Sequence, residues 1–214
     1  ACHVDGADAT RQIEEDLEIA ARLMHDLCLP TLVARRPLWD TFPGAHYTVG
    51  IDVVMPDGRT LQVASVHHYR DQWARAFDVR YEDAQGEQQY CHQTTYGMSE
   101  RLLGAVVGIH GDDRGLILPP AIAPHQAVIV PVLTKEGADD VLAACRELQA
   151  QLRDAGLRVH LDDRDLRPGQ KYYDWEIRGV PLRLELGPRD LASDECVLAP
   201  RTGGKDSVPL AGAT

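Results

Sequence analysis

The first clear pattern in the sequence is a run of apolar residues at helical spacing. Between Thr10 and Pro30 they recur every three or four positions, at Ile13, Leu17, Ala20, Met24 and Leu27. This spacing places one apolar stripe along a helix, and Pro30 lacks the amide proton that a further turn would need. The sequence therefore predicts an amphipathic helix that ends before Pro30 and packs its stripe against the remainder of the fold.

The residues that follow are typical of antiparallel strands. Residues 51–55 and 60–68 are β-prone and flank a Pro-Asp-Gly turn, whose glycine can supply the positive φ of a hairpin. Two further β-prone runs are expected at 76–81 and 88–94. The polar connections are the basic segment 35–37, the loop 42–48, the hairpin turn 56–58 and the turn 82–86. Together they predict a meandering antiparallel sheet.

Residues 98–109 are apolar nearly all round after the first turn, and Gly104 and Gly108 would let neighbouring backbone approach. This composition predicts a buried helix laid on the sheet. The run 116–118, closed by two prolines, predicts one more short strand. Pro124 then marks the expected boundary between two domains.

Beyond Pro124 the pattern changes to strands that alternate with helices. The expected elements are a strand at 127–133, a helix at 137–154, a strand at 157–161, a helix at 168–178 and a strand at 182–186. This alternation predicts crossovers and a mixed, largely parallel sheet. We therefore expect an α+β domain around an antiparallel sheet at 1–123 and an α/β domain at 124–214. The tail after Gly203 has too little pattern for a prediction.

Composition narrows the classes of function. The hydrophobic (44%) and charged (26%) fractions are those of an ordinary globular protein. The net charge of −11 argues against indiscriminate nucleic-acid binding, which depends on neutralising phosphates. Residues 125–214 hold 12 of the basic and 15 of the acidic residues, whereas residues 1–124 hold the other 10 and 18. The second half is therefore the better candidate for an RNA partner, and we expect no DNA partner.

Cysteine use and hydropathy indicate the compartment. The five cysteines are far apart and form no CxxC pair, so we expect free thiols and no metal site. No window approaches the roughly 18 apolar residues of a membrane span. These features predict a cytoplasmic protein without a membrane partner. The chain begins with Ala1, which suggests a fragment.

Polar residues on the second hairpin strand form a first candidate site. The two-residue period of a strand places Ser65 and His67 on one face, with Gln62 on the other unless a bulge intervenes. The pattern alone favours the interpretation that these are partly exposed residues of a sheet rather than members of a functional site. His67 and His68 point to opposite faces, which argues against a two-histidine metal site.

Arg101 is a second candidate. It lies in the first turn of an otherwise apolar helix, where the helix dipole disfavours a cation unless an anion is near. The anion could be Glu100 or Asp52 in an ion pair, or the phosphate of a ligand. Local sequence does not choose between these two interpretations.

Further polar runs occur later in the chain. The glycine-containing loops 110–115 and 203–207 lack the spacing of a nucleotide-binding loop, so we reject both as nucleotide cradles by themselves. Between 162 and 190, acidic residues lie beside Arg164 and Lys171. These residues could form hydrogen bonds with the base edges of an unpaired RNA loop. Alternatively, they could form ion pairs at the solvated surface, and composition favours this second interpretation.

Five runs in this order closely resemble prolyl-tRNA synthetase, in the form without an inserted editing domain. They are 42–48 (FPGAHYT), 62–68 (QVASVHH), 97–101 (GMSER), 110–120 (HGDDRGLILPP) and 179–190 (GVPLRLELGPRD). The resemblance implies part of a class II catalytic domain that activates proline with ATP and Mg²⁺, and then an anticodon-binding domain for tRNA(Pro). The implied function is that of a proline–tRNA ligase.

The resemblance also implies roles for individual residues. In the family, a Gln-x-x-Thr-x-His run lines the pocket for ATP and proline, and the arginine of the third motif binds ATP phosphate; Arg101 matches it as the catalytic group. The implied ATP set is Gln62, Ser65, Gly97, Ser99 and Arg101, and the implied proline set is Ser65, His67 and Tyr96. The implied anticodon contacts are Arg164, Lys171 and Glu185.

The sequence departs from the family in ways that change the expectation. The first two motifs are missing from the matched region, Ser65 replaces threonine, Val66 replaces serine, and Tyr96 replaces tryptophan. We therefore expect a fragment of a longer, homodimeric enzyme, inactive alone. Two alternatives stay open: a truncated paralogue that binds tRNA or a protein without catalysis, and a variant that activates a proline analogue.

Overall fold

The computed structural model describes residues 1–134 and 136–212, and the chain forms two compact units, Ala1–Ile109 and His110–Thr214. Each unit has its own sheet, so the two are described separately. The predicted domain boundary at Pro124 falls inside the second unit and stays a prediction. Across the part of the chain that is described, no helix is both long enough and apolar enough to cross a membrane.

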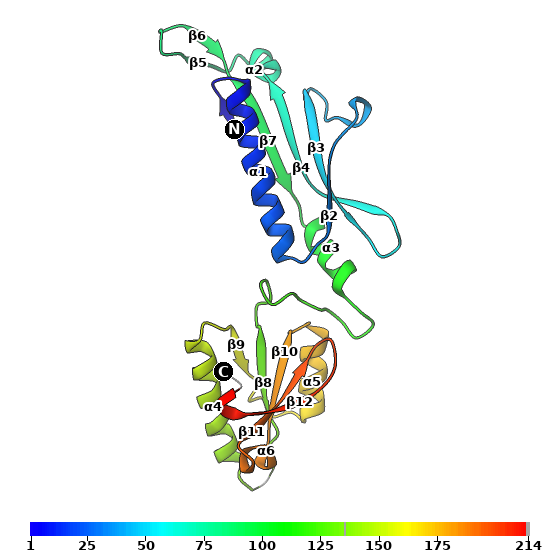
Figure 1. Ribbon diagram of the computed structural model, residues 1–214, viewed down its shortest axis with the longest axis vertical. Coiled ribbons are helices and arrows are strands. Elements are labelled where there is room, and N and C mark those ends of the chain that lie inside the picture. The colour runs from blue at the N-terminus through cyan, green and yellow to red at the C-terminus, as the bar shows by residue number, and fades with distance from the viewer. Residues whose placement is uncertain (135, 213–214) are drawn as a thin grey trace. The chain divides into compact units, whose positions relative to one another are not determined.

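The first unit is built on a five-stranded antiparallel sheet, as the sequence pattern predicted (Figure 1). The strand order is β1-β7-β4-β3-β2. The strands are β1 (Cys2–His3), β2 (Thr31–Arg35), β3 (Tyr47–Val54), β4 (Thr60–Arg70) and β7 (His92–Met98). The β3–β4 hairpin is confirmed, and its turn depends on Gly58, which has a φ of 82°. Strand β2 was not predicted.

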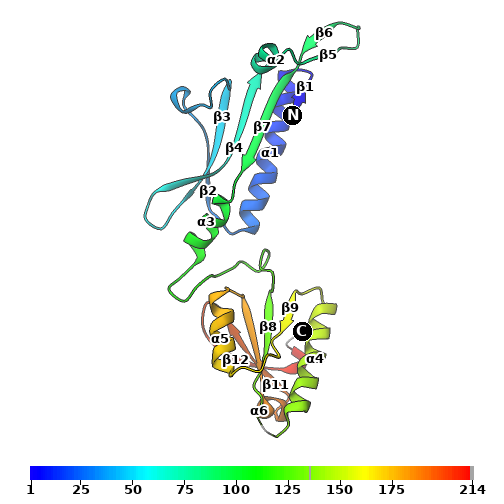
Figure 2. The same ribbon diagram turned by 180° about the vertical axis from the view of Figure 1, so that it is seen from behind.

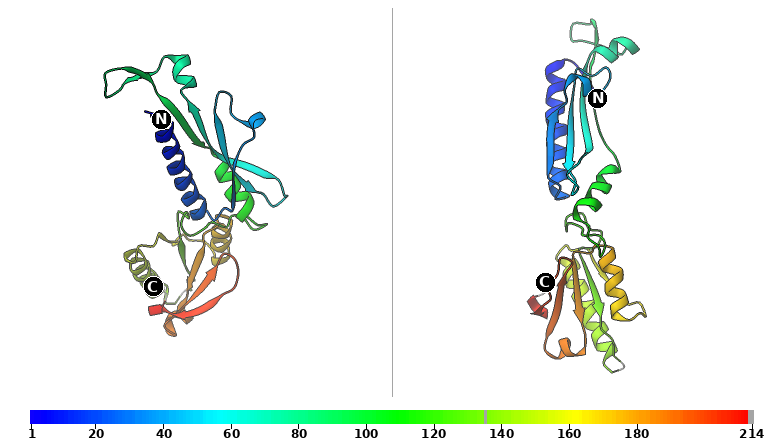
Figure 3. Two further views of the ribbon diagram at one scale, coloured as in Figure 1. Left: turned by 45° about the horizontal axis from the view of Figure 1, so that its top comes forward. Right: turned by 90° about the vertical axis from the view of Figure 1, so that its right-hand side faces the viewer.

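Helix α1 (Gly6–Asp26) covers one face of this sheet, and the right-hand view of Figure 3 shows the two as adjacent layers. Asp5 begins the helix, because its carboxylate accepts a hydrogen bond from the Asp8 amide at 2.8 Å. Asp16 rather than Leu17 is buried in the middle of the stripe, where Gln12 Nε2 donates to its carboxylate at 3.0 Å. The buried residues of the helix are Ala9, Ile13, Asp16, Ala20 and Met24.

The prediction of a strand at 76–81 is wrong in its first half. Its first two residues belong to helix α2 (Gln72–Phe77), which an Arg75–Asp71 ion pair of 2.7 Å stabilises across one turn. The helix ends at Asp78, whose φ of 52° lies in the left-handed region. Strand β5 (Arg80–Glu82) follows and pairs with β6 (Gln88–Tyr90) in a separate two-stranded sheet.

The helix expected at 98–109 is present as α3 (Arg101–His110), but it is not buried. Among its described residues only Ala105 and Val106 are buried, whereas Leu103 is 64% exposed and Val107 50% exposed. An apolar composition therefore predicted the helix correctly and its burial wrongly. The reason is that no other element of this unit covers its outer side.

The second unit contains a mixed sheet of order β12-β11-β10-β8-β9. Its strands are β8 (Ala127–Pro131), β9 (Val159–Leu161), β10 (Leu182–Leu186), β11 (Glu195–Pro200) and β12 (Asp206–Pro209). β8 pairs in parallel with β9 and β10, as the alternation predicted, while β11 pairs antiparallel with both of its neighbours. The antiparallel strands β11 and β12 come from residues where no strand was predicted from the sequence.

Two helices enclose this sheet from opposite faces, as Figures 1 and 2 show. Helix α4 (Ala138–Asp154) packs Val141, Cys145 and Leu148 on one face, and α5 (Pro168–Ile177) packs Trp175 on the other. The shorter elements are α6 (Pro188–Ala192) and the 3₁₀ turns η1 (Leu38–Asp40) and η2 (Leu210–Gly212). The two predicted helices are confirmed within one or two residues.

The strand expected at 116–118 is not formed. This segment instead runs beside the end of α5, where the Leu116 amide donates to Ile177 O at 3.0 Å and the Leu118 amide to Gly179 O at 3.2 Å. Gly115 and Gly179 have positive φ, and a side chain on either would overlap the opposing backbone. The two glycines therefore let this segment pack closely against the backbone at the end of α5.

Three histidines, His46, His68 and His92, lie close together near the start of α1. His68 is buried, and its ring centre lies 5.9 Å from that of His46 and 6.3 Å from that of His92. Burial lowers the pKa of both His46 and His68, with a further contribution from nearby positive charge. The folded protein therefore holds these two rings neutral.

We predict that the first unit loses stability as the pH falls through the ordinary histidine pKa, about 6.5. The unfolded chain binds protons there that the folded chain excludes, so the free energy of unfolding decreases from pH 7.5 to pH 5.5. Urea unfolding at the two pH values measures this. His68→Gln should reduce the difference, whereas His25→Gln, on the exposed side of α1, should leave it unchanged; equal behaviour of the two variants would contradict the prediction.

Candidate functional site

Cross-strand pairing determines which predicted residues share a face of the first sheet. Strand β3 pairs Gly50 with Ser65 and Asp52 with Gln62, so Val63 is an extra residue, a β-bulge, in β4. Gly50 and Asp52 are two positions apart and therefore point to the same face. The bulge thus brings Gln62 to the face that carries Ser65. The opposite face holds buried apolar residues of β3 and β4 and packs against α1.

A chain of hydrogen bonds fixes His67 on this polar face. The Phe42 amide donates to Thr48 Oγ1 at 3.0 Å, Thr48 Oγ1 lies 2.9 Å from His67 Nδ1, and Ser65 Oγ lies 3.0 Å from His67 Nε2. Burial lowers the pKa of His67, which favours the neutral ring. A neutral ring donates from one nitrogen and accepts at the other, so one of the two hydroxyls donates to His67 and the other accepts from it. The two hydroxyls together hold the orientation of the ring.

Arg101 closes one end of this face. Its Nη1 donates to the Gln62 carbonyl at 3.0 Å, and its amide donates to Ser99 Oγ at 3.4 Å. Within residues 1–134 and 136–212, no carboxylate lies at ion-pair distance from Arg101, and Asp52 is paired with Arg36 instead, at 2.6 Å. Of the two interpretations that the sequence left open, the ion pair with Glu100 or Asp52 is therefore not formed among these residues. The guanidinium lies at the first turn of α3, where its charge and the helix dipole together favour an anion.

The residues of β7 divide between the two faces. Gly97 pairs with Ser65 and Tyr96 pairs with Val66, so Gly97 lies on the polar face and Tyr96 lies on the opposite one. A β-carbon built on Gly97 meets nothing within 4 Å, which leaves the space above the strand open to a ligand. The structure does not bring Tyr96, on the α1 side, together with Ser65 and His67.

The sequence analysis missed Arg36 as a member of this face. Its guanidinium lies directly over Gly50, where any side chain would overlap it, and it pairs with Asp52 at 2.6 Å. Hydrogen bonding to Asp52 raises the pKa of Arg36, so the side chain stays charged. Asp52 in an otherwise apolar strand was the signal that a cation would be needed, because buried carboxylates are paired.

An aromatic cavity adjoins His67. Its volume is about 420 Å³, and its lining includes Phe42, Tyr69, Trp73 and Phe77. The Phe42 ring centre lies 5.0 Å from that of His67, and the Trp73 and Phe77 rings are stacked at 5.6 Å. An apolar cavity beside a few fixed polar groups is the usual form of a small-molecule site.

In the second unit, Asp162 joins two of the predicted anticodon residues. It is fully buried, accepts a bidentate pair of bonds from Arg164 at 2.8 and 2.7 Å, and accepts from Trp175 Nε1 at 2.7 Å. Burial raises the pKa of Asp162, but the bonds from Arg164 and Trp175 outweigh it and lower the pKa to about 2. Arg164 also pairs with Asp174 at 3.0 Å and keeps 40% of its side chain exposed.

Lys171 does not reach the surface. It is 1% exposed, and its Nζ donates to the backbone oxygen of Asp162 at 2.9 Å. A buried ammonium with this bond stabilises the turn at Asp162 and is not available to RNA. The predicted anticodon role of Lys171 therefore does not agree with the structure. The sequence could not reveal this, since the run around Lys171 is polar on both sides.

Glu185 lies apart from this pair, on β10. Arg183 Nε donates to it at 2.9 Å, and Lys205 Nζ donates to both of its oxygens at 2.8 Å. Burial raises the pKa of Glu185, and the bonds from these two cations outweigh it and lower the pKa. Among the described residues, no group of three or more His, Cys, Asp or Glu side chains is arranged to hold a metal ion.

Comparison with known protein families finds a match for each of the two units. A family model described as "tRNA synthetase class II core domain (G, H, P, S and T)" matches residues 1–110. A second model, described as "Anticodon binding domain", matches residues 126–212. The first contains the polar face and Arg101, and the second contains the mixed sheet.

Three individual relatives that match the chain are all named as enzymes specific for proline. The chain is 57% identical over 199 residues to a proline–tRNA ligase of Thermococcus kodakarensis, covering 93% of this chain and 41% of the relative. It is 53% identical to a proline–tRNA ligase of Methanosarcina mazei, covering 97% and 44%. The solved structure of Giardia lamblia prolyl-tRNA synthetase in complex with prolyl-adenylate matches with a TM-score of 0.92 and 37% identity, covering 99% and 44%. The chain thus spans about two fifths of the length of these relatives.

We predict that Lys171→Ala destabilises the second unit. The variant leaves the Asp162 carbonyl without its donor and creates a cavity in the core, which together cost on the order of 2–4 kcal/mol in the free energy of unfolding. Urea unfolding measures this loss. Lys205→Ala, which removes a half-exposed ion pair, should cost no more than about 1 kcal/mol; a loss as small in Lys171→Ala would show that the buried ammonium is not structural.

Proposed function

Because this chain belongs to the class II tRNA synthetases of the G, H, P, S and T group, we propose that it serves the ligation of proline to tRNA(Pro). The observation that carries the proposal is the bulge at Val63, which places Gln62 beside Ser65 and His67 on one open face that ends at Arg101. The proline–tRNA ligases at 57% and 53% identity support the choice of amino acid.

In this proposal the open face binds ATP. The adenine lies over Gly97, where no side chain occupies the space, and Gln62 and Ser99 contact the nucleotide beside it. Arg101 binds phosphate, because it is a cation at a helix N-terminus without a carboxylate partner among the described residues. Mg²⁺ bound with the ATP would neutralise phosphate charge beside Arg101.

The aromatic cavity binds proline. Its rings provide an apolar surface that a pyrrolidine ring can contact. His67, whose ring centre lies 5.0 Å from that of Phe42, and Ser65, which is hydrogen-bonded to His67, offer hydrogen bonds to the polar end of the amino acid. The proline carboxylate attacks the α-phosphorus of ATP, the bond to pyrophosphate breaks, and prolyl-adenylate forms. The role of this chain is positioning and charge neutralisation by Arg101, without a covalent intermediate on the protein. Tyr96 stays a predicted contact that the present geometry does not support.

The second unit binds the anticodon of tRNA(Pro). Its match to an anticodon-binding family supports this, as do the half-exposed Arg164 and the Arg183–Glu185–Lys205 group. The adenylate is then attacked by a ribose hydroxyl at the 3′ end of the tRNA, which releases AMP. We further propose a homodimeric, cytoplasmic enzyme; the exposed apolar residues of α3 and the five free thiols support these two points.

Proline-dependent exchange of pyrophosphate into ATP tests the proposal. The full-length gene product should catalyse it with proline and at most weakly with proline analogues. A protein that binds tRNA(Pro) without any exchange would support the alternative of a non-catalytic binding module. Exchange that prefers an analogue over proline would support the variant activity.

We predict that Arg101→Ala slows proline activation in the full-length product by on the order of 100-fold or more, because it removes a charge that stabilises the phosphate in the transition state. Pyrophosphate exchange at varied ATP concentration measures kcat and KM. The matched control is Arg22→Ala, which removes another exposed cation, from the outer side of α1. Similar rates in the two variants would remove Arg101 from the site.

We also predict that Gly97→Ala raises the KM for ATP by about tenfold or more without loss of stability. The new methyl group enters the open space over β7, where it contacts no protein atom but meets the nucleotide. Exchange kinetics and urea unfolding measure the two effects. Gly104→Ala on α3, whose β-carbon also meets nothing within 4 Å, serves as the control. A KM unchanged in Gly97→Ala would place the adenine elsewhere.

A further inference from the structure

Two of the five thiols lie together at the edge of the first sheet. Cys2 belongs to β1, and Cys91 directly precedes β7. These two strands pair antiparallel with Cys2 opposite Gln93, so Cys91 is the diagonal neighbour of Cys2. Gln93 Nε2 donates to Cys2 Sγ at 3.7 Å, and positions two apart on a strand share a face. The pairing of the strands therefore brings both thiols to one side of the sheet.

The two thiols have different surroundings. Cys2 is exposed, whereas Cys91 is only 4% exposed. Burial raises the pKa of the Cys91 thiol, and hydrogen bonding to Cys2 and the charge that Cys2 can carry raise it further. Cys91 therefore keeps its proton, and Cys2 is the sulfur that a dissolved oxidant meets. An accessible cysteine next to a second cysteine is an arrangement found in redox-sensitive proteins.

Cys2 is also part of the wall of the aromatic cavity. Gln93 and Thr95 belong to the same wall, and Thr95 Oγ1 lies 3.2 Å from the hydroxyl of Tyr69. Strand β1 is only two residues long and is the edge strand of its sheet, so a small shift of β1 breaks few hydrogen bonds. A change in the position of Cys2 therefore changes the shape of this cavity.

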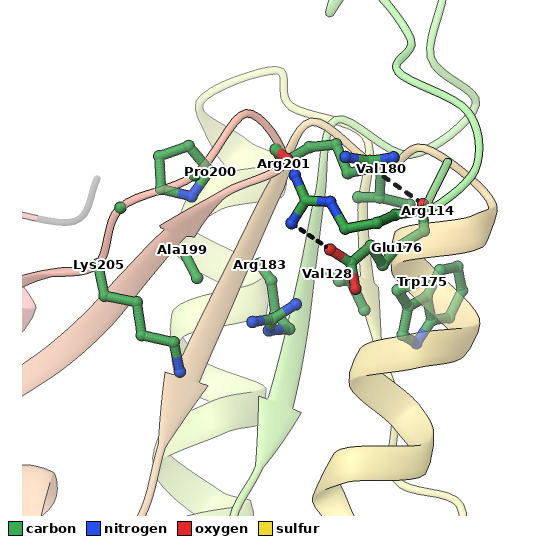
Figure 4. A pocket seen from close by; sticks show the side chains of 12 residues that line it. Arg114, Val128, Trp175, Glu176, Val180, Arg183, Ala199, Pro200, Arg201 and Lys205 are labelled. Carbon is green, nitrogen blue, oxygen red and sulfur yellow. Dashed lines mark hydrogen bonds and ion pairs between the residues drawn. The ribbon is translucent and has the colours of Figure 1, made fainter. Parts of the chain in front are cut away.

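The other three cysteines are placed differently. Cys28 is exposed, but it follows α1, a helix of 21 residues that spans about 30 Å and begins near Cys2. Cys145 and Cys196 are 0% exposed and lie in the core on the α4 face of the second sheet. The cavity that Figure 4 shows lies beside Trp175 on the other face of that sheet and does not open toward them. Access and a neighbouring thiol therefore occur together at Cys2 and Cys91.

We propose that Cys2 and Cys91 are a peroxide-sensitive thiol pair whose oxidation changes the aromatic cavity. The Cys2 sulfur attacks one oxygen of hydrogen peroxide, the O–O bond breaks, and the other oxygen leaves as water with the Cys2 proton, which gives a sulfenic acid. The Cys91 sulfur then attacks the Cys2 sulfur, the S–O bond breaks, and the hydroxyl leaves as water with the Cys91 proton. Two thiols are thus oxidised to one disulfide, and one peroxide is reduced to two molecules of water.

The disulfide draws β1 toward the start of β7. The Cα atoms of a disulfide lie about 4.4–6.8 Å apart, whereas diagonal neighbours of an antiparallel pair lie about 7–8 Å apart. The edge strand therefore moves, and Cys2 leaves its place in the cavity wall beside Gln93. We expect weaker binding of proline as the result. This effect rests on the proposed function, whereas formation of the disulfide does not.

Alkylation and mass spectrometry of the chain test for the disulfide. The chain is treated briefly with a molar excess of hydrogen peroxide, denatured, and alkylated with N-ethylmaleimide. All five cysteines should react in the untreated chain, and two fewer should react after treatment. Trypsin should then release the peptides 1–11 and 81–101 as one linked product. Full alkylation after treatment, or a disulfide that joins other cysteines instead, would overturn the inference.

Three variants assign the linkage. Cys2→Ser, at an exposed position, should abolish it. Cys91→Ala should stop the reaction at the sulfenic acid, which dimedone traps on peptide 1–11. The matched control is Cys28→Ser, which removes the other exposed thiol and should retain the linkage. Loss of the linkage in this control would show that it forms by exchange through Cys28 and would overturn the assignment.

Pyrophosphate exchange by the full-length product tests the effect on the cavity. Peroxide should raise the KM for proline about fivefold with little change in kcat or in the KM for ATP, as expected for weaker substrate binding. Dithiothreitol should reverse the change, Cys2→Ser should lose this response to peroxide, and Cys28→Ser should retain it. An unchanged KM for proline in protein that carries the disulfide would overturn the link to the cavity. Absence of exchange before treatment would overturn the proposed function, and the linked peptides would still report on the thiol pair.

Discussion

One extra residue in β4 controls the composition of the candidate catalytic face. Without the bulge at Val63, strand alternation would turn Gln62 toward α1, and the carbonyl that Arg101 contacts would shift with it. Because a strand has a period of two, a single inserted position moves everything beyond it to the other face. The bulge therefore allows Gln62 to join Ser65 while Ala64 and Val66 stay in the core under α1.

The polar face is kept rigid by bonds that leave selected groups free. Both ring nitrogens of His67 are hydrogen-bonded, one to Thr48 and one to Ser65. Arg36 lies over Gly50 and neutralises Asp52. Each of these partly buried polar groups would be costly without its partner. Among the described residues of this site, Arg101 has no carboxylate at ion-pair distance, and Arg36 Nε is buried without a hydrogen-bond partner. Both are suited to a ligand that is anionic and accepts hydrogen bonds.

The sequence pattern predicted the elements that depend on local periodicity. It missed the features that depend on contacts with residues far away in the chain. The helix at α1, the hairpin of β3 and β4, and the parallel strands β8 to β10 follow from spacing and turn residues, and the structure confirms them. The burial of α3 was wrong because apolar composition does not reveal whether a neighbour is present. Segment 116–118 has strand-like residues, but its hydrogen-bonding partner is the end of α5, which lies about sixty residues later. The burial of Lys171 likewise could not be predicted without knowing that the turn at Asp162 folds over this residue.

The acidic net charge of the chain does not conflict with an RNA-binding role, since local pairing matters more than the total. In the second unit, Arg114, Lys205 and Arg183 each contact a carboxylate, so no large positive field extends into solvent. A duplex approaching at random therefore gains little, because counterion release needs uncompensated cations. Carboxylates beside the cations thus lower the general affinity of the second unit for nucleic acid. With a net charge of −11, the chain offers an RNA partner of the proposed function no overall attraction, so such a partner gains its affinity from its shape and from contacts at particular residues.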